Sequence, residues 1–246
     1  MFHDIPRVKD VIISEYADNI IVYCSGSSFN EVKAKVQDQI NKLYELTKTC
    51  CLTINPNITK EILFTNKKLD QPTCIFLNNK SIEYVKTFKY LGMVLDAPNF
   101  RWKPHIDHIR NSSVSKINIL KTISAKQWGA DRIFLLILYK SLVRSNFDHG
   151  AKFYCTASDT NLQKLDSLQN IYIRLVIGVQ KTSPTLSLEV ESNIPPLKIH
   201  RMFLLLKYIW KFRELPESIE CCKLVKDNVN HLLEKIGPAS KLNHLC

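Results

Sequence analysis

Two β-branched runs open the chain and are followed by a helical pattern. Residues 11–14 and 20–24 are largely apolar and flank the polar stretch 15–19, which is typical of a β-hairpin. From residue 28 to residue 48, apolar side chains recur every three to four positions, and this spacing predicts a helix. Ser28 followed by Glu31 predicts a capping box at the first turn of that helix.

Short apolar runs follow this helix and predict a small antiparallel sheet. They are separated by Asn, Lys, Asp and Pro and occupy residues 61–65, 73–77, 81–85 and 87–95. Runs this short and this often interrupted favour strands over helices. The first 96 residues are therefore predicted to be β-rich with one crossing helix.

Helical spacing dominates after Pro98. In the segment 159–178, Asp159 is the predicted N-cap and Gly178 is the predicted C-terminal end of a helix. The stretch 96–100 separates the two patterns, so we predict an α+β fold with two regions, residues 1–96 and residues 97–246. The predicted helices of the second region are residues 104–121, 131–146, 159–178 and 196–214, with a weaker pattern over 216–236.

Composition narrows the class of protein. The chain has 246 residues, of which 45% are hydrophobic and 23% charged, as in globular rather than disordered proteins. No apolar run approaches the ~20 residues of a membrane-spanning helix, and the start carries no apolar export signal. We therefore expect an intracellular protein that is not secreted and has no membrane partner.

The eight cysteines show no Cys-x-x-Cys spacing, so we expect buried free thiols rather than zinc ligands or disulfides.

Two stretches leave alternatives open. His105 and His108 are spaced to share one helical face, which suits a metal ion but equally two surface or capping histidines. No third ligand is near in the sequence, so the second interpretation is favoured. Residues 203–211 suit an amphipathic helix on a membrane surface, but a core helix whose lysines reach solvent is favoured. The sequence has no P-loop, dinucleotide-binding or hydrolase-elbow motif.

The net charge of +11 is concentrated in the second region. Residues 1–96 carry a net charge of +1 and residues 97–246 a net charge of +10. A basic region beside a neutral one predicts a surface for a polyanion, with nucleic acid ahead of an acidic membrane. A domain that is merely basic is the alternative.

The most informative motif is Tyr16-Ala17-Asp18-Asn19 at the tip of the predicted hairpin. Carboxylates at a rigid turn can converge on a divalent ion for metal-dependent phosphoryl transfer. Asp and Asn are also common at β-turns because they tolerate the backbone angles that turns require. The spacing alone therefore leaves both interpretations open.

Motifs in the first region resemble the reverse transcriptases of non-LTR retrotransposons of the LINE-type, jockey-like kind. Residues 11–25, centred on Tyr-Ala-Asp-Asn, are similar to the family's Tyr-x-Asp-Asp box, and His-Asp-Ile-Pro at residues 3–6 is similar to its lead-in. Residues 55–59 resemble its Asn-Pro-x-Lys-Thr stretch, with Ile58 at the lysine position. Phe-Lys-Tyr-Leu-Gly at residues 88–92 resembles its primer-grip hairpin.

The likeness continues into the second region. Trp-Lys-Pro-His-Ile at residues 102–106 resembles the start of the family's thumb, and residues 168–178 and 196–197 are similar to patterns further along these polyproteins. The matches follow the expected order and span nearly the whole chain. The resemblance therefore implies a partial polymerase palm in residues 1–96 and an α-helical thumb and connection region in residues 97–246.

The resemblance also implies a function and its residues. The implied activity is RNA-directed DNA synthesis on an RNA template and a DNA primer with two divalent ions, taken to be Mg²⁺. Asp18 matches the first carboxylate of the box, as catalytic residue and metal ligand, and Asn19 occupies the position of the second. The implied primer grip is Phe88, Lys89, Tyr90, Leu91 and Gly92. We expect nucleic-acid contacts from Lys86, Arg101, Lys103, Arg110, Lys116 and Lys121, with Tyr90 and Trp102 as candidates for stacking.

Departures from the family pattern predict that the chain does not polymerise DNA by itself. Asn19 is neutral and a poorer metal ligand than aspartate. In the family, the fingers and the first palm aspartate come before the box, and this sequence begins shortly before it, so we expect them to be missing. We expect template–primer binding at most, with a dNTP bound only if the missing palm and fingers complement the chain. The alternatives are a non-catalytic nucleic-acid-binding module and a decayed mobile-element product with no activity.

Overall fold

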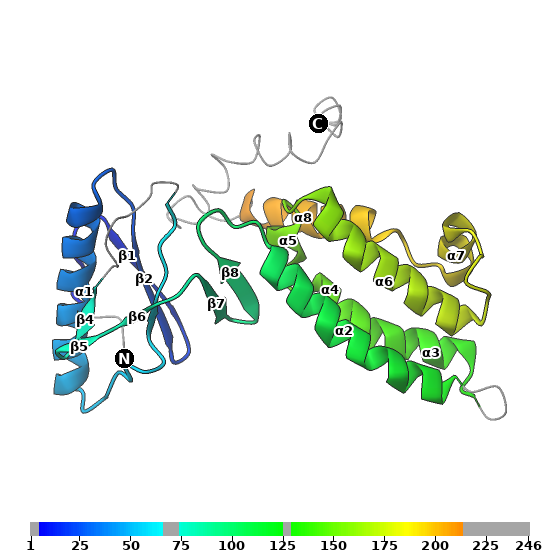
Figure 1. Ribbon diagram of the computed structural model, residues 1–246, viewed down its shortest axis with the longest axis horizontal. Helices are drawn as coiled ribbons and strands as arrows, with labels where there is room; N and C mark the ends of the chain where they lie inside the picture. The colour runs from blue at the N-terminus through cyan, green and yellow to red at the C-terminus, as the bar shows by residue number, and fades with distance from the viewer. Residues whose placement is uncertain (1–4, 66–73, 125–128, 214–246) are drawn as a thin grey trace. The chain divides into compact units, whose positions relative to one another are not determined.

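The computed structural model describes residues 5–65, 74–124 and 129–213, and the chain divides into two compact units (Figure 1). The first unit comprises Met1–Phe88 with Ala97–Asn99, and the second comprises Lys89–Asp96 with Phe100–Cys246. The division therefore falls inside one hairpin, and most of that hairpin packs with the helical unit. The palm and thumb assignments of residues 1–96 and 97–246 stay predictions.

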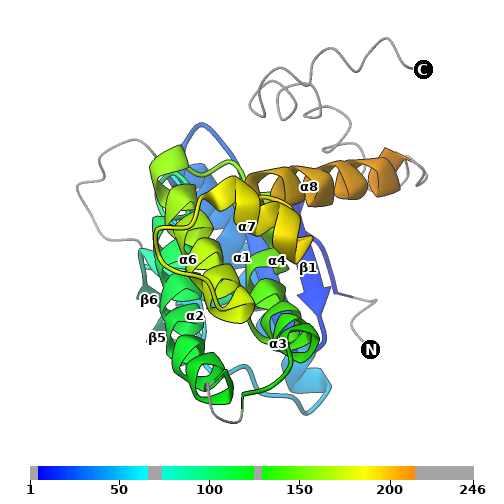
Figure 2. The same ribbon diagram turned by 90° about the vertical axis from the view of Figure 1, so that its right-hand side faces the viewer.

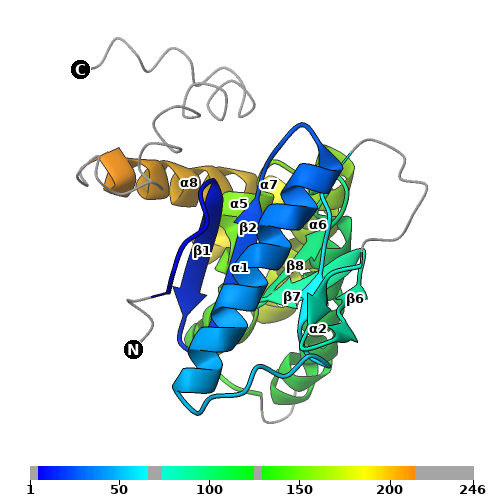
Figure 3. The same cartoon turned by 90° about the vertical axis from the view of Figure 1, so that its left-hand side faces the viewer.

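The first unit is built on a hairpin and a long helix. Strands β1 (Val11–Tyr16) and β2 (Asn19–Cys24) pair antiparallel, with Val11 opposite Cys24 and Tyr16 opposite Asn19. Helix α1 (Phe29–Thr49) packs against both strands (Figure 3). The hairpin and the helix confirm the sequence prediction.

A buried polar side chain ties the beginning of the described chain to α1. The amide oxygen of Gln39 accepts a hydrogen bond from the backbone N–H of Val8 (2.7 Å), and its Nε2 donates to the carbonyl of Pro6 (2.9 Å). Gln39 is fully buried, and these bonds satisfy both ends of its amide. The predicted capping box is wrong, because Ser28 is the N-cap but its side chain makes no cap bond and Glu31 pairs with Lys35 (2.7 Å).

The remaining strands of the first unit are short and do not form the single antiparallel sheet that was predicted. Strand β3 (Lys60–Glu61) pairs parallel with β6 (Glu83–Tyr84), while β4 (Phe76–Leu77) pairs antiparallel with β5 (Lys80–Ser81). Each apolar run is interrupted after a few residues, so it supports a ladder of only two residues. Ile75, Leu77 and Ile82 form a small core that packs on Val36 and Ile40 of α1.

Strands β7 (Thr87–Tyr90) and β8 (Met93–Asp96) form the hairpin at which the two units divide. The two residues between them, Leu91 and Gly92, both have positive φ, 46° and 83°. Positive φ at both central residues is the type I′ turn that suits the twist of a two-residue hairpin. A leucine in this conformation is uncommon, since its Cβ crowds the backbone there.

The second unit is a bundle of helices (Figure 2). Helix α2 packs along α6, which also contacts α3, α7 and α8, while α5 packs on α8. A single core joins them, with its largest fully buried side chains from Ile106, Leu120, Tyr139, Phe147, Tyr154, Leu165, Tyr172 and Ile173. The helices are α2 (Lys103–Ile123), α3 (Arg132–Leu138), the π-helix η1 (Tyr139–Arg144), α4 (Ser145–Asp148), α5 (Ala151–Tyr154), α6 (Asp159–Ile177), α7 (Thr185–Ser192) and α8 (Leu197–Arg213).

A group of buried polar side chains inside this core forms a hydrogen-bonded network. Tyr139 Oη and an Arg144 guanidinium nitrogen both donate to the amide oxygen of Gln169, whose Nε2 donates to the carbonyl of Pro195 (3.1 Å). The Arg144 Nε lies 3.3 Å from a carboxylate oxygen of Asp148. Burial raises the pKa of Tyr139 to about 12, so its phenol stays a donor at neutral pH.

Several predictions for the second unit need correction in detail. The predicted helix 131–146 is divided by the π-helix η1, and the N-cap of α6 is Ser158 rather than Asp159. Gly178, with φ of 78°, ends α6 as predicted. The weaker pattern over 216–236 lies outside the described residues.

Cysteine and membrane predictions can also be compared with the structure. Cys24, Cys50, Cys51, Cys74 and Cys155 are free thiols, as predicted, but Cys51 is exposed and the other four are half-buried rather than buried. None of the described helices combines the length and apolarity that crossing a bilayer requires. In α8, Leu205 and Ile209 are buried and Lys207 and Lys211 are exposed, as the core-helix interpretation predicts. Phe203 and Trp210 of the same stretch are exposed, so only one side of this helix lies in the core.

Candidate nucleic-acid interface

Asp18 lies at the tip of the first hairpin, in a two-residue turn between β1 and β2. Ala17 precedes it with a positive φ of 54°, and Asp18 and Asn19 are both exposed. The Asn19 side-chain amide donates a hydrogen bond to a carboxylate oxygen of Asp18 (3.1 Å). The sequence therefore placed the motif correctly at a hairpin tip, where a carboxylate and an amide are presented side by side.

This turn offers few ligands for a divalent ion. Asp18 supplies a carboxylate and Asn19 an amide oxygen, and Mg²⁺ accepts both kinds of ligand. Among the described residues, no group of three His, Cys, Asp or Glu side chains gathers closely enough to hold a metal ion. The described residues around Asp18 therefore do not fit a two-ion centre.

The tip of the β7–β8 hairpin rests on the turn between α4 and α5. The Nε2 of His149 donates to the carbonyl oxygen of Leu91 (3.1 Å). A Cβ on Gly92 would lie 2.7 Å from that same Nε2, and a Cβ on Gly150 would overlap the thioether of Met93. Two glycines thus allow the close approach of hairpin and turn, and both have positive φ.

One strand of the hairpin is bonded to α2 through His105. The backbone N–H of Val94 donates to His105 Nδ1 (3.2 Å). The ring is 1% exposed and lies edge-on to the rings of Trp102 and Tyr154. Because Nδ1 accepts a hydrogen bond, the neutral ring carries its proton on Nε2, which has no hydrogen-bond partner among the described residues.

The electrostatic surroundings of His105 keep it neutral. Burial, together with smaller electrostatic contributions from His108, His149 and Lys89, lowers its pKa from 6.5 to about 4. His108, by contrast, is exposed, and its Nε2 lies 3.3 Å from the ammonium of Lys89. The prediction of two surface or capping histidines therefore holds for His108 and is wrong for His105, whose ring is buried and accepts a backbone N–H.

Asp96 fixes the end of the hairpin to the start of α2. Its carboxylate oxygens accept hydrogen bonds from the backbone N–H groups of Arg101 and Trp102, each at 3.0 Å. Asp96 is 7% exposed, and a carboxylate at a helix N-terminus is favourable for the helix dipole. Asp96 therefore acts as an N-cap side chain for α2, although it lies five positions before Arg101.

The predicted basic residues on α2 do not share one face. At 100° per residue, Lys103, Arg110 and Lys121 fall within about 20° of one another, and all three are exposed. His105 and His108, which contact the hairpin, lie on the opposite side of the helix. The Lys116 ammonium donates to the carbonyl of Leu142 (2.7 Å) and is half-buried.

The other predicted contact residues fall on both units. Lys86 is exposed on the first unit, while Arg101 and Lys89 are exposed on the second. Tyr90 is half-buried. Trp102 is 8% exposed and packs against Phe100 and His105, so the candidate stacking role of Trp102 is not supported by its position.

Sequence reasoning missed the residues that support the hairpin. Asp96, His149 and Gly150 were not singled out, although Gly150 follows a predicted helix and such a glycine signals a turn. Their partners lie far away in the sequence, as with His149 and Leu91. No local sequence pattern predicts contacts between residues so far apart in the chain.

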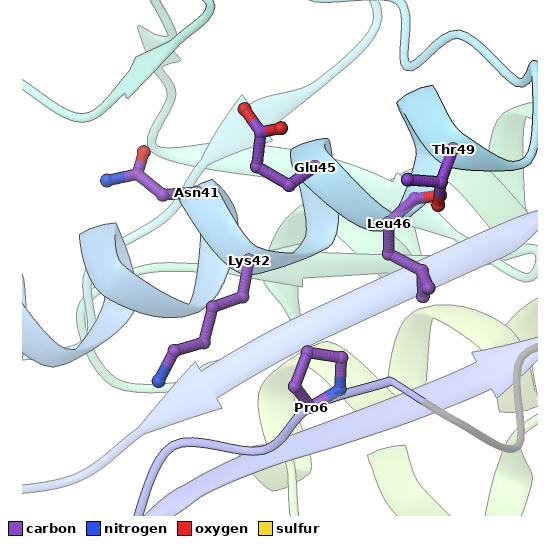
Figure 4. A pocket seen from close by; sticks show the side chains of 6 residues that line it. All are labelled: Pro6, Asn41, Lys42, Glu45, Leu46 and Thr49. Carbon is purple, nitrogen blue, oxygen red and sulfur yellow. The ribbon is translucent and has the colours of Figure 1, made fainter.

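A shallow pocket on α1 contains none of the predicted site residues. Figure 4 shows Pro6 lying across from Lys42 and Leu46, with Asn41, Glu45 and Thr49 completing the lining. Lys42 pairs with Asp38 on the same helix (3.0 Å). The pocket carries no nucleophile next to a base, and it has no part in the interface.

Comparison with known proteins adds to this geometry. The chain is 23% identical over 188 residues to the RNA-directed DNA polymerase from mobile element jockey of Drosophila funebris, which covers 76% of this chain and 20% of that protein. It is also 23% identical over 211 residues to the jockey polymerase of Drosophila melanogaster, covering 86% of this chain and 23% of that protein. Its sequence is similar to those of non-LTR retrotransposon polymerases.

Further relatives agree with this similarity. The Pol polyprotein from type-1 retrotransposable element R1 of Bradysia coprophila is 28% identical over 144 residues, which cover 58% of this chain and 14% of that protein. The family resemblance stated from the motifs is thus confirmed. The chain spans about a fifth of the length of the two jockey polymerases. No family model matches the chain, and no solved structure gives a significant match.

Proposed function

We propose that this chain is part of an RNA-directed DNA polymerase of a non-LTR retrotransposon and that it contacts the RNA template and DNA primer. The observation that carries the proposal is the similarity to jockey polymerases over 76% and 86% of the chain. The order of elements agrees with it, because an Asp-bearing hairpin is followed by a second hairpin and then by a helical unit.

Binding would come from exposed cations on the second unit. Lys103, Arg110 and Lys121 form one line on α2, where they would meet separate phosphates of the nucleic-acid backbone. Lys89 lies on the β7–β8 hairpin, on the other side of α2. Phosphate contacts of this kind give affinity without sequence preference, and that affinity weakens as salt rises.

Asp18 would contribute a carboxylate to the palm, with Mg²⁺ and a dNTP bound only in a more complete polymerase site. Asn19 adds no negative charge at the second position, and its amide already donates to Asp18. We therefore propose that the chain by itself binds template–primer without extending the primer.

A salt titration of template–primer binding tests the proposed contacts. Four phosphate contacts predict a slope of log K against log salt of roughly −3 to −4. Lys103→Met should reduce the magnitude of this slope by about one. Lys42→Met on α1 is the matched control, and it should leave the slope unchanged. A wild-type slope near zero contradicts the proposal.

A primer-extension assay with Mg²⁺ or Mn²⁺ tests the second part. We expect no extension by the wild-type chain, and binding that is unaltered in Asp18→Ala. Extension that disappears in Asp18→Ala would show instead that this hairpin supports synthesis by itself.

A further inference from the structure

The β7–β8 hairpin is held on the second unit by contacts that come from distant parts of the chain. His105 on α2 accepts the backbone N–H of Val94, and His149 in the α4–α5 turn donates to the carbonyl of Leu91. Gly150 leaves the space that Met93 fills. We call these three residues, His105, His149 and Gly150, the hairpin seat.

The seat determines where exposed Lys89 and half-buried Tyr90 lie. Lys89 and Tyr90 are at the end of β7, immediately before the turn that His149 contacts. A two-stranded hairpin is marginal by itself in water, so the seat must supply the order that a larger sheet would otherwise provide.

We propose that His105 and the His149–Gly150 turn are positioning residues that fix the β7–β8 hairpin for binding of the primer strand. The proposal rests on the proposed function, since it assigns the hairpin to nucleic-acid binding. The seat residues touch the hairpin and not the ligand, so their loss should weaken binding without removing a phosphate contact.

The chemistry of His105 suits this role and not that of a phosphate ligand. Its Nδ1 is engaged by Val94, and the ring is buried between Trp102 and Tyr154. Lys89, His108 and His149 are the charged or titratable neighbours on β7, α2 and the α4–α5 turn, and they disfavour a second positive charge on the ring. Neutral His105 is therefore the form that holds Val94.

Paired variants of His105 test the positioning role. In asparagine the side-chain oxygen is attached to Cγ, as Nδ1 is in histidine, so His105→Asn can still accept the Val94 N–H. His105→Leu keeps an apolar side chain but has no acceptor. Amide hydrogen exchange at Val94 reports on the seat, and template–primer affinity at several salt concentrations reports on binding.

We expect His105→Leu to speed exchange at Val94 by about tenfold or more, to lower the affinity, and to leave the salt slope unchanged. His105→Asn should restore slow exchange and affinity together. Lys89→Met should do the reverse of His105→Leu, reducing the magnitude of the slope by about one while exchange at Val94 stays slow.

Each remaining outcome is decisive. If amide exchange at Val94 is unchanged in His105→Leu, His105 does not hold the hairpin. If exchange at Val94 is faster but template–primer affinity is unaltered, the position of the hairpin does not matter for binding. If His105→Leu does not fold, His149→Ala replaces it, because that side chain is exposed and exchange at Gly92 and Met93 can be followed instead. Absence of template–primer binding by the wild-type chain would refute the proposed function. The exchange data would still show whether the seat residues hold the β7–β8 hairpin.

Discussion

Lowering the pH should destabilise the second unit through His105. Burial and neighbouring cations hold its folded-state pKa at about 4, against an ordinary value of 6.5. Because the fold favours the neutral ring, the unfolded chain takes up a proton first as the pH falls. The resulting stabilisation is fully present above pH 6.5 and is lost progressively toward pH 4.

The size of the effect follows from the two pKa values. Between pH 7 and pH 4.5, a shift from 6.5 to about 4 removes roughly 2.5 kcal/mol from the free energy of unfolding. This is a large part of the stability of a typical domain. The loss belongs to a single side chain, so it can be isolated by substitution.

Urea unfolding followed by tryptophan fluorescence measures this loss. All three tryptophans of the chain belong to the second unit, and Trp102 lies against the His105 ring. In His105→Asn, the drop in unfolding free energy between pH 7 and pH 4.5 should be smaller than in the wild type by roughly 2.5 kcal/mol. His108→Asn, at an exposed position on the same helix, should keep most of the drop, because burial is the largest cause of the lowered His105 pKa.

An equal drop in the wild type and in His105→Asn would refute the reasoning. It would mean that His105 titrates alike in the folded and unfolded chains, so that its burial does not exclude the proton. The pH dependence would then belong to other groups, and His105 would lose its assignment as a neutral acceptor.

Other substitutions test the remaining contacts. Asp96→Ala leaves two backbone N–H groups at the start of α2 without their acceptor and should lower the unfolding free energy by about 2–3 kcal/mol in the same urea experiment; an unchanged value would contradict the capping role. Gly150→Ala forces a Cβ onto the Met93 thioether at positive φ, which should cost about 2 kcal/mol and speed amide exchange in β8; slow exchange would show that the approach is not tight. Lys116→Met should lower the free energy of unfolding by about 1–2 kcal/mol and leave the salt slope of template–primer binding unchanged. Lys121→Met should leave the free energy of unfolding unchanged and reduce the magnitude of that slope by about one. The opposite pattern would place Lys116 at the ligand.

The long elements could be predicted because their periodicity is local. Helices α1, α2, α6 and α8 each carry three or more turns of regularly spaced apolar residues, and their predicted bounds differ from the observed ones by only a few residues. Errors arose where neighbours compete, as at Ser158 and Asp159, which are both good N-cap residues. The strands after α1 could be located but not paired, since two-residue ladders carry no register signal.

The residues of the candidate site differ in the same way, because some could be predicted from the local sequence and others could not. The Asp18 turn was visible in the sequence, because polar turn residues lie there between two apolar runs. Residues 87–95 formed one apolar run, and only the family resemblance indicated a hairpin at residues 88–92. The supports of the second hairpin were not visible, since His149 and Leu91 are brought together only by packing. Lys116 could have been recognised, because it lies three residues after buried Ser113 and four before buried Leu120, on the same side of α2.

The π-helix η1 has a consequence for tolerance to insertion and deletion. A π turn holds more residues than an α turn, and here it allows Tyr139 and Arg144 to reach the same amide oxygen of Gln169. Because a π turn holds one residue more than the α turn it replaces, removing one residue between positions 139 and 144 would rewind the segment as ordinary α-helix and leave Phe147, which is fully buried, close to its present orientation. This segment should therefore accept a single-codon deletion more readily than the neighbouring α-helical turns, with the joint contact of Tyr139 and Arg144 to Gln169 as the interaction that is lost.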